Sequence, residues 1–299
     1  MKRLVVLALI LLLAAGSLWM AQRRKRTDVV SPDAVLGVTA DWQREAVAAP
    51  MHLTRLSDAE EIHIGNNLAA VYIAEEPSHN TEATATEAYI SKIGTRVASQ
   101  AHRKLPYRFH LIADRNLINA FAIPGGHVFV GQGLLDQMTS EDELAFVLGH
   151  EIEHIDHYHA VERVQIEARL KALDLDVVAS LAELPVALWQ AGYSKDQEME
   201  ADREGLRLAA AGGYSAQGAL NMLGRWTKLH DEYVIHASAP VDELSEVAID
   251  GLQGYFRSHP LPSERLVQAQ QIIAQDQLDT TRQLTPFRVE YETTSGAGR

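Results

Sequence analysis

Apolar side chains recur at helical spacing along much of the chain. In the first such stretch, Ile62, Leu68 and Tyr72 fall roughly on one helical face, and Ser57 with Glu60 forms a capping box ahead of them. A second capping box, at residues 140 and 143, opens another helix, and a Gly-Gly pair ends a later one. The pattern predicts further helices over residues 88–101, 140–163, 196–211, 215–230 and 263–274.

Short alternating stretches predict a small sheet between the second and third helices. Residues 107–113 alternate apolar and polar side chains, as a half-buried strand does. Residues 119–122 and 127–130 are two more strand candidates around the turn signal Pro124-Gly125-Gly126. Polar residues 75–84 predict a loop, and residues 231–258 look irregular. The expected fold class is therefore α+β and predominantly α-helical.

The N-terminus carries an uncharged run of 18 residues, Leu4 to Ala21, between two basic clusters. Such a run is at the short end of what spans a bilayer. A cleaved signal peptide and an uncleaved anchor both fit. We favour the anchor, because the apolar stretch continues through Leu18, Trp19 and Met20. The positive-inside rule draws the body towards the cytoplasm, whereas a signal peptide would export it.

Composition and charge exclude several classes of protein. The 299 residues are 46% apolar and include no cysteine, which rules out disulfides, a Cys-ligated zinc site and a thiol nucleophile. Six Lys or Arg and no acid lie in residues 1–26, so residues 27–299 carry a formal net charge of −19 against −13 for the whole chain. A body this acidic should not bind nucleic acid through a basic face.

The helix that begins near residue 140 contains His150-Glu151-Ile152-Glu153-His154. Two histidines at i and i+4 lie on one helical face, so both imidazoles can reach one metal ion. Glu151 lies about 100° round the helix from His150, where its carboxylate can take a proton from a water molecule that the metal activates. This is the H-E-x-x-H arrangement of zinc metalloproteases. The alternative is a solvated helix face that carries the pattern by chance.

A catalytic zinc needs a third protein ligand and one open position. The extended H-E-x-x-H-x-x-G-x-x-H motif is excluded, because residue 157 is His and residue 160 is Ala. Glu198 and Asp202 share one helical face, whereas Glu200 points away. Glu198 can then bind the metal while Asp202 accepts a hydrogen bond from a ligating histidine. Spacing alone equally allows an acidic, solvated helix face.

The sequence resembles the HtpX/Oma-type gluzincin metallopeptidases, a family that includes the CAAX prenyl proteases. The resemblance spans roughly residues 57–275. The segments that carry it are NAFAIPGGHVFV with GLL (119–135), HEIEH (150–154), YSKDQEMEAD (193–202) and SHPLPSER (258–265). It implies that His150, His154 and Glu198 hold one Zn²⁺ per chain, with Glu151 as general base, and that the small sheet lies beside the H-E-x-x-H helix.

The resemblance also assigns expectations to residues outside the metal-binding motif. Asn119, Ala120, Phe121 and Ala122 would line the cleft at a sheet edge, where an extended substrate could add as a strand; an ordinary core strand fits them too. The family often has Arg where this chain has Lys195. Lysine cannot form the bidentate fork of arginine, so a contact that positions this helix would be weaker.

His259 and Arg265 belong to the last of these segments. Three roles are open for His259: a donor to the oxyanion of the tetrahedral intermediate, a reversible fourth zinc ligand that silences the enzyme, or a loop histidine held by a local hydrogen bond. Arg265 is expected to support the site from outside the ligand set, as Asp202 does. The other histidines nearby are expected to be surface or structural residues: His127, His157 and His159.

The resemblance implies a zinc-dependent endopeptidase that hydrolyses misfolded or unassembled proteins. A single candidate span favours the soluble-bodied, envelope quality-control branch, in the periplasm rather than the cytoplasm. Expected partners are polypeptide substrates and the membrane, through the N-terminal segment; the oligomeric state is open. The alternative is a chaperone or adaptor that holds unfolded chains in the same cleft, and a structural zinc protein would need His259 as a permanent fourth ligand.

These expectations divide the chain into four regions. They are an N-terminal signal or anchor segment (1–26), a linker (27–56), a metallopeptidase domain (57–275) and a flexible C-terminal tail (276–299).

Overall fold

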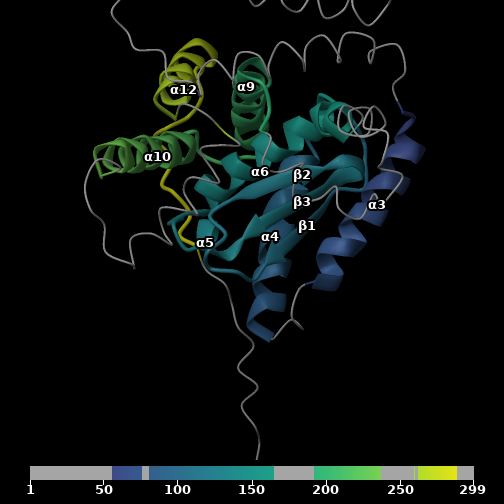
Figure 1. Cartoon of the computed structure of the whole chain (residues 1–299). Coiled ribbons are helices and arrows are strands. Elements are labelled where there is room, and N and C mark those ends of the chain that lie inside the picture. The colour runs from purple at the N-terminus through teal and green to yellow at the C-terminus, as the bar shows by residue number, and fades with distance from the viewer. Residues whose placement is uncertain (1–55, 76–80, 165–191, 237–258, 260–261, 288–299) are drawn as a thin grey trace, which may run out of the picture. The chain divides into compact units, whose positions relative to one another are not determined.

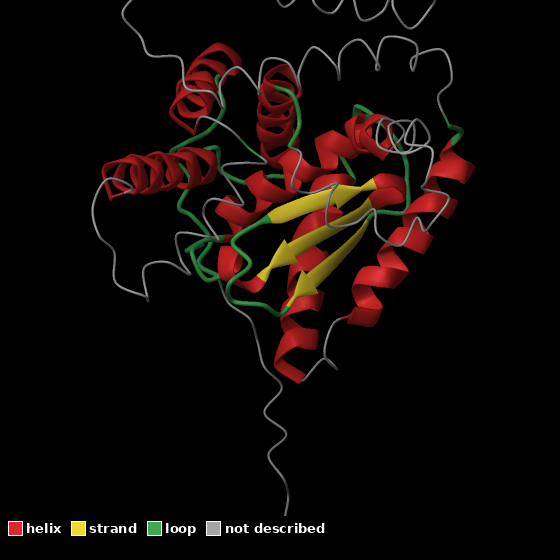
Figure 2. Cartoon of the chain, in the orientation of Figure 1, coloured by secondary structure: helices red, strands yellow, loops and turns green. Residues whose placement is uncertain are grey.

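Helices and one small sheet account for most of the residues that the computed structural model describes, which are 56–75, 81–164, 192–236, 259 and 262–287 (Figures 1 and 2). All of them belong to one unit, residues 47–299. The predicted N-terminal segment, nearly all of the predicted linker and residues 165–191 lie outside the described residues. None of the helices in the described ranges has both the length and the apolar character that a membrane span requires.

The sheet has three strands, β1 (Arg108–Ile112), β2 (Ala120–Ile123) and β3 (His127–Gly131), in the order β1-β3-β2. β1 runs parallel to β3, and β2 runs antiparallel to it. A 3₁₀ turn, η2 (Pro124–Gly126), joins β2 to β3, and its two glycines have φ of 81° and 98°, which L-residues rarely adopt. A short helix, α5 (Gln132–Leu135), follows β3. Among the described strands, β2 is an edge strand.

Helices cover both faces of this sheet. α3 (Asp58–Glu75) packs on the face that carries Phe121 and Phe129. α4 (Thr81–Ala98) and α6 (Glu141–Asp156) pack on the other face, where the main core lies. The register explains the division, because partners across β2 and β3 put alternate residues on opposite faces. The main-core face of these two strands consists of Ala120, Ala122, Val128 and Val130.

Three further helices follow: α9 (Lys195–Ala211), α10 (Gln217–His236) and α12 (Pro262–Asp276). α9 crosses α6 with the two backbones in direct contact. A Cβ atom placed on Gly149 of α6 would lie 2.5 Å from the carbonyl oxygen of Gly205 in α9, and one on Gly205 would lie 2.5 Å from the backbone nitrogen of residue 150. Two glycines therefore set how closely the two helices approach.

Several predicted helix boundaries are wrong. The second helix spans Thr81–Ala98 rather than 88–101, so part of the predicted polar loop is helical. Its first turns are rich in Ala, Glu and Thr. Alanine and glutamate are good helix formers, but such a stretch shows no apolar periodicity. α10 also continues past the predicted end at residue 230 to His236.

The predicted helix over 140–163 is interrupted. α6 ends at Asp156, Tyr158 adopts φ of 65°, and a new helical segment covers residues 159–164. No Gly or Pro marks this break in the sequence; tertiary contacts hold it instead. The Asp156 carboxylate accepts the backbone N–H of Arg103 at 2.6 Å, and the Arg103 guanidinium lies over the Tyr158 ring, 3.9 Å from its centre.

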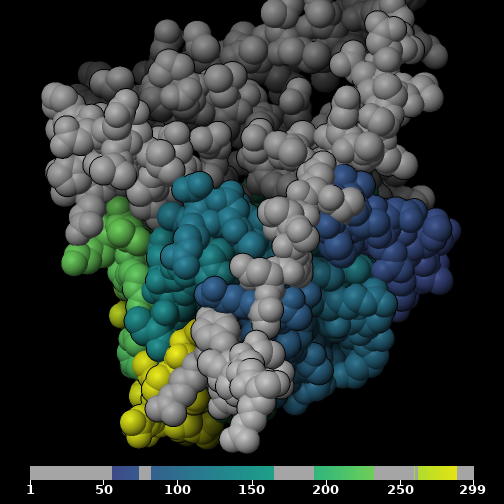
Figure 3. Space-filling view, turned by 90° about the horizontal axis from the view of Figure 1, so that it is seen from below, coloured from purple at the N-terminus to yellow at the C-terminus, as the bar shows by residue number. Residues whose placement is uncertain are grey.

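The first residues of the predicted C-terminal tail (276–299) contact the rest of the domain. Residues 277–287 pack against the start of α6: the Glu141 N–H donates to the Thr285 carbonyl, and the Thr285 N–H donates to Asp142, both at 2.8 Å. The ring of Phe287 lies against a tyrosine of α4. In the space-filling view, the yellow C-terminal residues lie beside the green of α10 (Figure 3). Residues 288–299 lie outside the described ranges.

A candidate metal centre between α6 and α9

The start of α6 is fixed by its cap. Ser140 accepts the backbone N–H of Glu143 at 3.2 Å, as predicted. The other half of the predicted box differs, because the Glu143 carboxylate accepts the N–H of Thr139 at 2.7 Å and is paired with Arg225 at 3.0 Å. The helix then runs through the buried core, so the pattern at 150–154 is buried on every side. The alternative of a solvated helix face is therefore wrong.

The start of α9 has a complete capping box between Ser194 and Gln197. This cap places Glu198 in the first turn, where the helix dipole favours a negative charge. Because Gly205 lets α9 lie directly on α6, Glu198 reaches the histidines of α6. It is 1% exposed, so the alternative of an acidic, solvated helix face is wrong for this residue.

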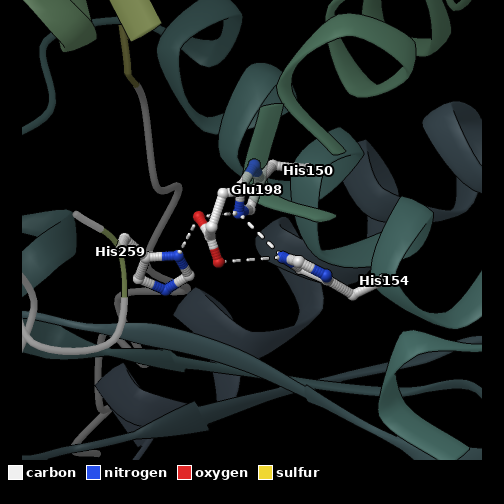
Figure 4. A group of neighbouring side chains, drawn as sticks. All are labelled: His150, His154, Glu198 and His259. Carbon is white, nitrogen blue, oxygen red and sulfur yellow. Dashed lines mark hydrogen bonds and ion pairs between the residues drawn. The ribbon is translucent and has the colours of Figure 1, made fainter. Parts of the chain in front are cut away.

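Four side chains converge between these helices (Figure 4). The Nε2 atoms of His150 and His154 lie 3.1 Å apart, and each lies 3.5 Å from an oxygen of Glu198. Ligand atoms about 2.0–2.1 Å from a tetrahedral metal are about 3.3 Å apart, so these separations suit one ion. His259 reaches the same cluster, with Nδ1 2.8 Å from Glu198 Oε2.

The electrostatics of this cluster call for a cation. All four side chains are buried, and Glu198 Oε1 has no hydrogen-bond partner among the described residues. Burial alone would raise the pKa of Glu198, but His259, His154 and His150 hold that pKa well below its ordinary value. Burial lowers the pKa of His154, so its imidazole is neutral and has a lone pair to offer. A buried carboxylate that faces the neutral imidazole of His154 fits a divalent metal ion.

Asp202 and Arg265 support His150 from behind. His150 Nδ1 lies 2.9 Å from Asp202 Oδ1, and Arg265 donates to both oxygens of Asp202 at 2.6 and 2.7 Å. Burial would raise the pKa of Asp202, but Arg265 and His150 lower it to about 2. The ionised carboxylate keeps the proton of His150 on Nδ1, so Nε2 faces the cluster as a lone pair. The Arg265 guanidinium in turn lies over the Trp226 ring, 5.6 Å from its centre.

His154 has two supports that the sequence did not reveal. Its ring stacks on Tyr193 with 3.7 Å between centres, and its Nδ1 lies 3.0 Å from Nδ1 of His159. Of the two roles that the sequence predicts for His159, surface or structural, its 4% exposure and its contact with this predicted ligand favour the structural one. It follows His154 by five residues, a spacing that brings side chains together only because the chain leaves the helix at Tyr158. His127 lies elsewhere, buried beside His110 and Asn66.

Glu151 lies next to the cluster without belonging to it. It is 2% exposed, and its Oε2 has no hydrogen-bond partner among the described residues. Burial raises its pKa to about 7. A carboxylate poised near neutral pH is suited to accept a proton and then return it.

The predicted substrate-binding segment lies along β2 beside α6. Ala120, Phe121 and Ala122 are buried, so their side chains fill the two cores and only backbone groups of this edge strand remain for pairing. A role in substrate binding stays a prediction. Lys195 contacts Glu264 at the protein surface, away from the buried ligand candidates.

Comparison with known proteins identifies similar sequences. The family model described as Peptidase family M48 matches residues 84–273. A relative from Vibrio cholerae is 32% identical over 219 residues, which cover 67% of this chain and 40% of the relative. The beta-barrel assembly-enhancing protease of Escherichia coli K12 is 29% identical over 199 residues (60% and 37%). Bovine mitochondrial metalloendopeptidase OMA1 is 39% identical over 116 residues (33% and 22%). The chain spans about two fifths of the length of the bacterial relatives.

Proposed function

The chain belongs to peptidase family M48, and from this premise we propose that it is a zinc-dependent endopeptidase. One observation carries the proposal: two imidazoles and a carboxylate converge in a buried cluster next to Glu151, whose Oε2 has no hydrogen-bond partner among the described residues. His150, His154 and Glu198 would hold one Zn²⁺ per chain. Two histidines and a glutamate are a common ligand set for a catalytic zinc, which keeps one further position open.

The residues around this site have separate roles in the proposed reaction. When bound, Zn²⁺ supplies Lewis-acid polarisation of the scissile carbonyl and lowers the pKa of water. Glu151 accepts the proton of the attacking water and delivers it to the leaving amine. Asp202 and Arg265 hold His150 in the tautomer that offers Nε2. The backbone of Asn119–Ala122 binds the substrate as an added strand, which gives affinity with little sequence preference.

For His259 we propose the role of a reversible fourth ligand. Its Nδ1 lies as close to Glu198 as a direct hydrogen bond allows, and all four ligand atoms lie within 4.8 Å of one another. A fourth protein ligand closes a zinc site, and catalysis needs an open position. His259 therefore has to leave before a substrate carbonyl can enter, and this separates the proposal from a structural zinc protein with a permanent fourth ligand.

The substrates we propose are misfolded or unassembled polypeptides of the cell envelope. The proposal is supported by the names of the relatives, a beta-barrel assembly-enhancing protease and a mitochondrial metalloendopeptidase. Residues 1–26 would tether the metallopeptidase domain to the membrane, through residues 27–56 as a linker. Protease protection of intact and lysed spheroplasts tests the location: digestion only after lysis would place the domain in the cytoplasm and contradict an envelope role.

Zinc content and casein cleavage test the central proposal on the full-length wild type, Glu151→Gln and His259→Ala. We expect one zinc per chain at this site in all three, no cleavage by Glu151→Gln, and faster cleavage by His259→Ala. Unchanged cleavage by His259→Ala would leave that residue without an inhibitory role. Bound zinc without cleavage in any variant would favour the chaperone or adaptor, and absence of zinc would contradict the metal site itself.

A further inference from the structure

A second group of potential ligands lies just behind the first. His157 and His159 follow the end of α6, and Glu200 lies on α9 two residues after Glu198. One ligand atom from each of His157, His159 and Glu200 lies within 4.8 Å of the others. His159 Nε2 is 3.3 Å from one Glu200 oxygen, and His157 Nδ1 is 3.6 Å from the other. These separations are close to the spacing of about 3.3 Å between ligands of one tetrahedral zinc.

A cation can reach this group from solvent, and it would replace Arg203, which lies 3.7 Å from the Glu200 oxygen that faces His157. The side chains of His157 and Glu200 are about one third exposed (32% and 36%), whereas that of His159 is buried (5%). His157 Nε2 lies 3.1 Å from the carboxylate of Glu153, which adds negative charge. When the proton of a neutral His157 is on Nε2, the atom near Glu153, Nδ1 keeps a lone pair on the side of Glu200.

We propose that His157, His159 and Glu200 form a second Zn²⁺ site, whose occupancy opposes that of the site formed by His150, His154 and Glu198. The opposition rests on the proposed function, since it requires zinc at the first site. The second site itself does not, because its three ligands are separate residues.

The opposition follows from the number of protons between His154 and His159. Zinc on Nε2 of a neutral imidazole leaves the proton on Nδ1. If both histidines bind zinc through Nε2, both carry a proton on Nδ1, and these two atoms are only 3.0 Å apart. Two donors then face each other with no acceptor between them. With zinc on His154 alone, Nδ1 of His159 accepts a hydrogen bond from the Nδ1–H of His154, and the Nε2–H of His159 faces Glu200.

The second metal should therefore inhibit. Loss of a supporting partner of a metal-ligating histidine typically weakens metal binding by roughly 10- to 100-fold. Coupling between two binding sites is reciprocal, so the second zinc should weaken the first by the same factor. Cleavage should fall once free zinc is high enough to fill the second site, and the enzyme should be most active with one zinc per chain.

The test uses equilibrium dialysis of the full-length protein against increasing free Zn²⁺, with bound zinc measured by mass spectrometry. Wild type should bind two zinc ions in two steps. His157→Asn should bind one, and so should His150→Ala, which retains the second site. The affinity of His150→Ala for this zinc should be about 10- to 100-fold higher than the affinity of wild type for its second zinc, because no metal occupies the first site. His63→Asn, which removes an exposed histidine of α3, is the matched control and should bind two.

The double variant His150→Ala/His157→Asn shows whether the zinc bound by His150→Ala occupies the second site. The double variant should bind no zinc. A parallel assay follows casein cleavage in excess zinc: wild type and His63→Asn should be inhibited, and His157→Asn should not. Binding of a single zinc by wild type that His157→Asn retains, or equal inhibition of His157→Asn, would overturn the proposal. Failure of the first site would appear differently, as zinc binding by wild type that His157→Asn abolishes altogether.

Discussion

At the scale of single residues, Glu151 connects stability to pH. Its ordinary pKa is 4.5, and burial raises it to about 7 in the metal-free fold. As pH rises from 4.5 through 7, the unfolded chain releases this proton while the folded chain keeps it, so the free energy of unfolding falls. Glu151→Gln cannot ionise. The free energy of unfolding of metal-free Glu151→Gln should therefore rise relative to that of wild type across this range. The difference should reach at most about 3 kcal/mol above pH 7.

Urea unfolding of both metal-free proteins at pH 5, 6, 7 and 8 measures this difference. Only the change in the difference with pH is diagnostic, since a glutamine can also alter packing. A difference that stays constant from pH 5 to 8 would show that Glu151 does not retain its proton in the fold.

Asp202 contacts His150, a proposed zinc ligand, from outside the proposed ligand set. Asp202→Asn should weaken zinc binding by roughly 10- to 100-fold, because an amide no longer holds the proton of His150 on Nδ1 by charge. Competition with a zinc chelator measures the affinity. Asp196→Asn, an exposed carboxylate in the first turn of α9, is the matched control and should bind zinc like wild type. Equal affinities for the two variants would remove Asp202 from the site.

At the scale of elements, the crossing of α6 and α9 positions the ligands. Gly205→Ala places a methyl group 2.5 Å from a backbone nitrogen of α6, so the helices must separate. Overpacking typically costs about 1–3 kcal/mol, and Glu198 should move away from His150. We expect a lower melting temperature and weaker zinc binding. Gly224→Ala in α10 meets nothing within 4 Å and should be neutral or stabilising by up to about 1 kcal/mol; a similar response of both variants would contradict the model of the crossing.

The sequence alone predicted the elements whose signals are local. The caps at Ser57 and Ser140, the strands around Pro124–Gly126 and the metal motif on α6 depend on residues within a few positions of one another. The break at Tyr158 could not be predicted, since contacts with Arg103 and its neighbours, over fifty residues earlier, hold it.

The same reason explains which site residues were missed. His159 and Tyr193 contact His154 only because the chain leaves the helix and later returns. The close approach at Gly149 and Gly205 joins two helices that are far apart in sequence, and neither glycine has a local reason to be there. Spacing on one helix could relate Glu198 to Asp202, whereas pairing Asp202 with Arg265 required the fold.

At the scale of the whole molecule, the C-terminal residues stabilise the helix that carries the metal motif. Removal of residues 277–299 would leave the N–H of Glu141 without its acceptor, remove the donor to Asp142 from Thr285, and remove the ring that packs on Tyr89. Each lost hydrogen bond costs about 1 kcal/mol, so the melting temperature should fall by several degrees. Truncation after Phe287 keeps these contacts and is the control. If both truncations melt alike, the contacts of residues 277–287 contribute nothing to stability.

The anchoring of α12 decides how far His259 can move. Arg265 holds α12 to Asp202 on α9, and only two residues separate His259 from Pro262, where α12 begins. Three extended peptide steps reach about 10 Å. A displaced His259 thus stays at an effective concentration of roughly millimolar or above. A short peptide would have to outcompete it from solution. A long chain that paired along β2, as we propose, would compete at its own high local concentration. The enzyme would then select substrates by the number of attachment points rather than by sequence.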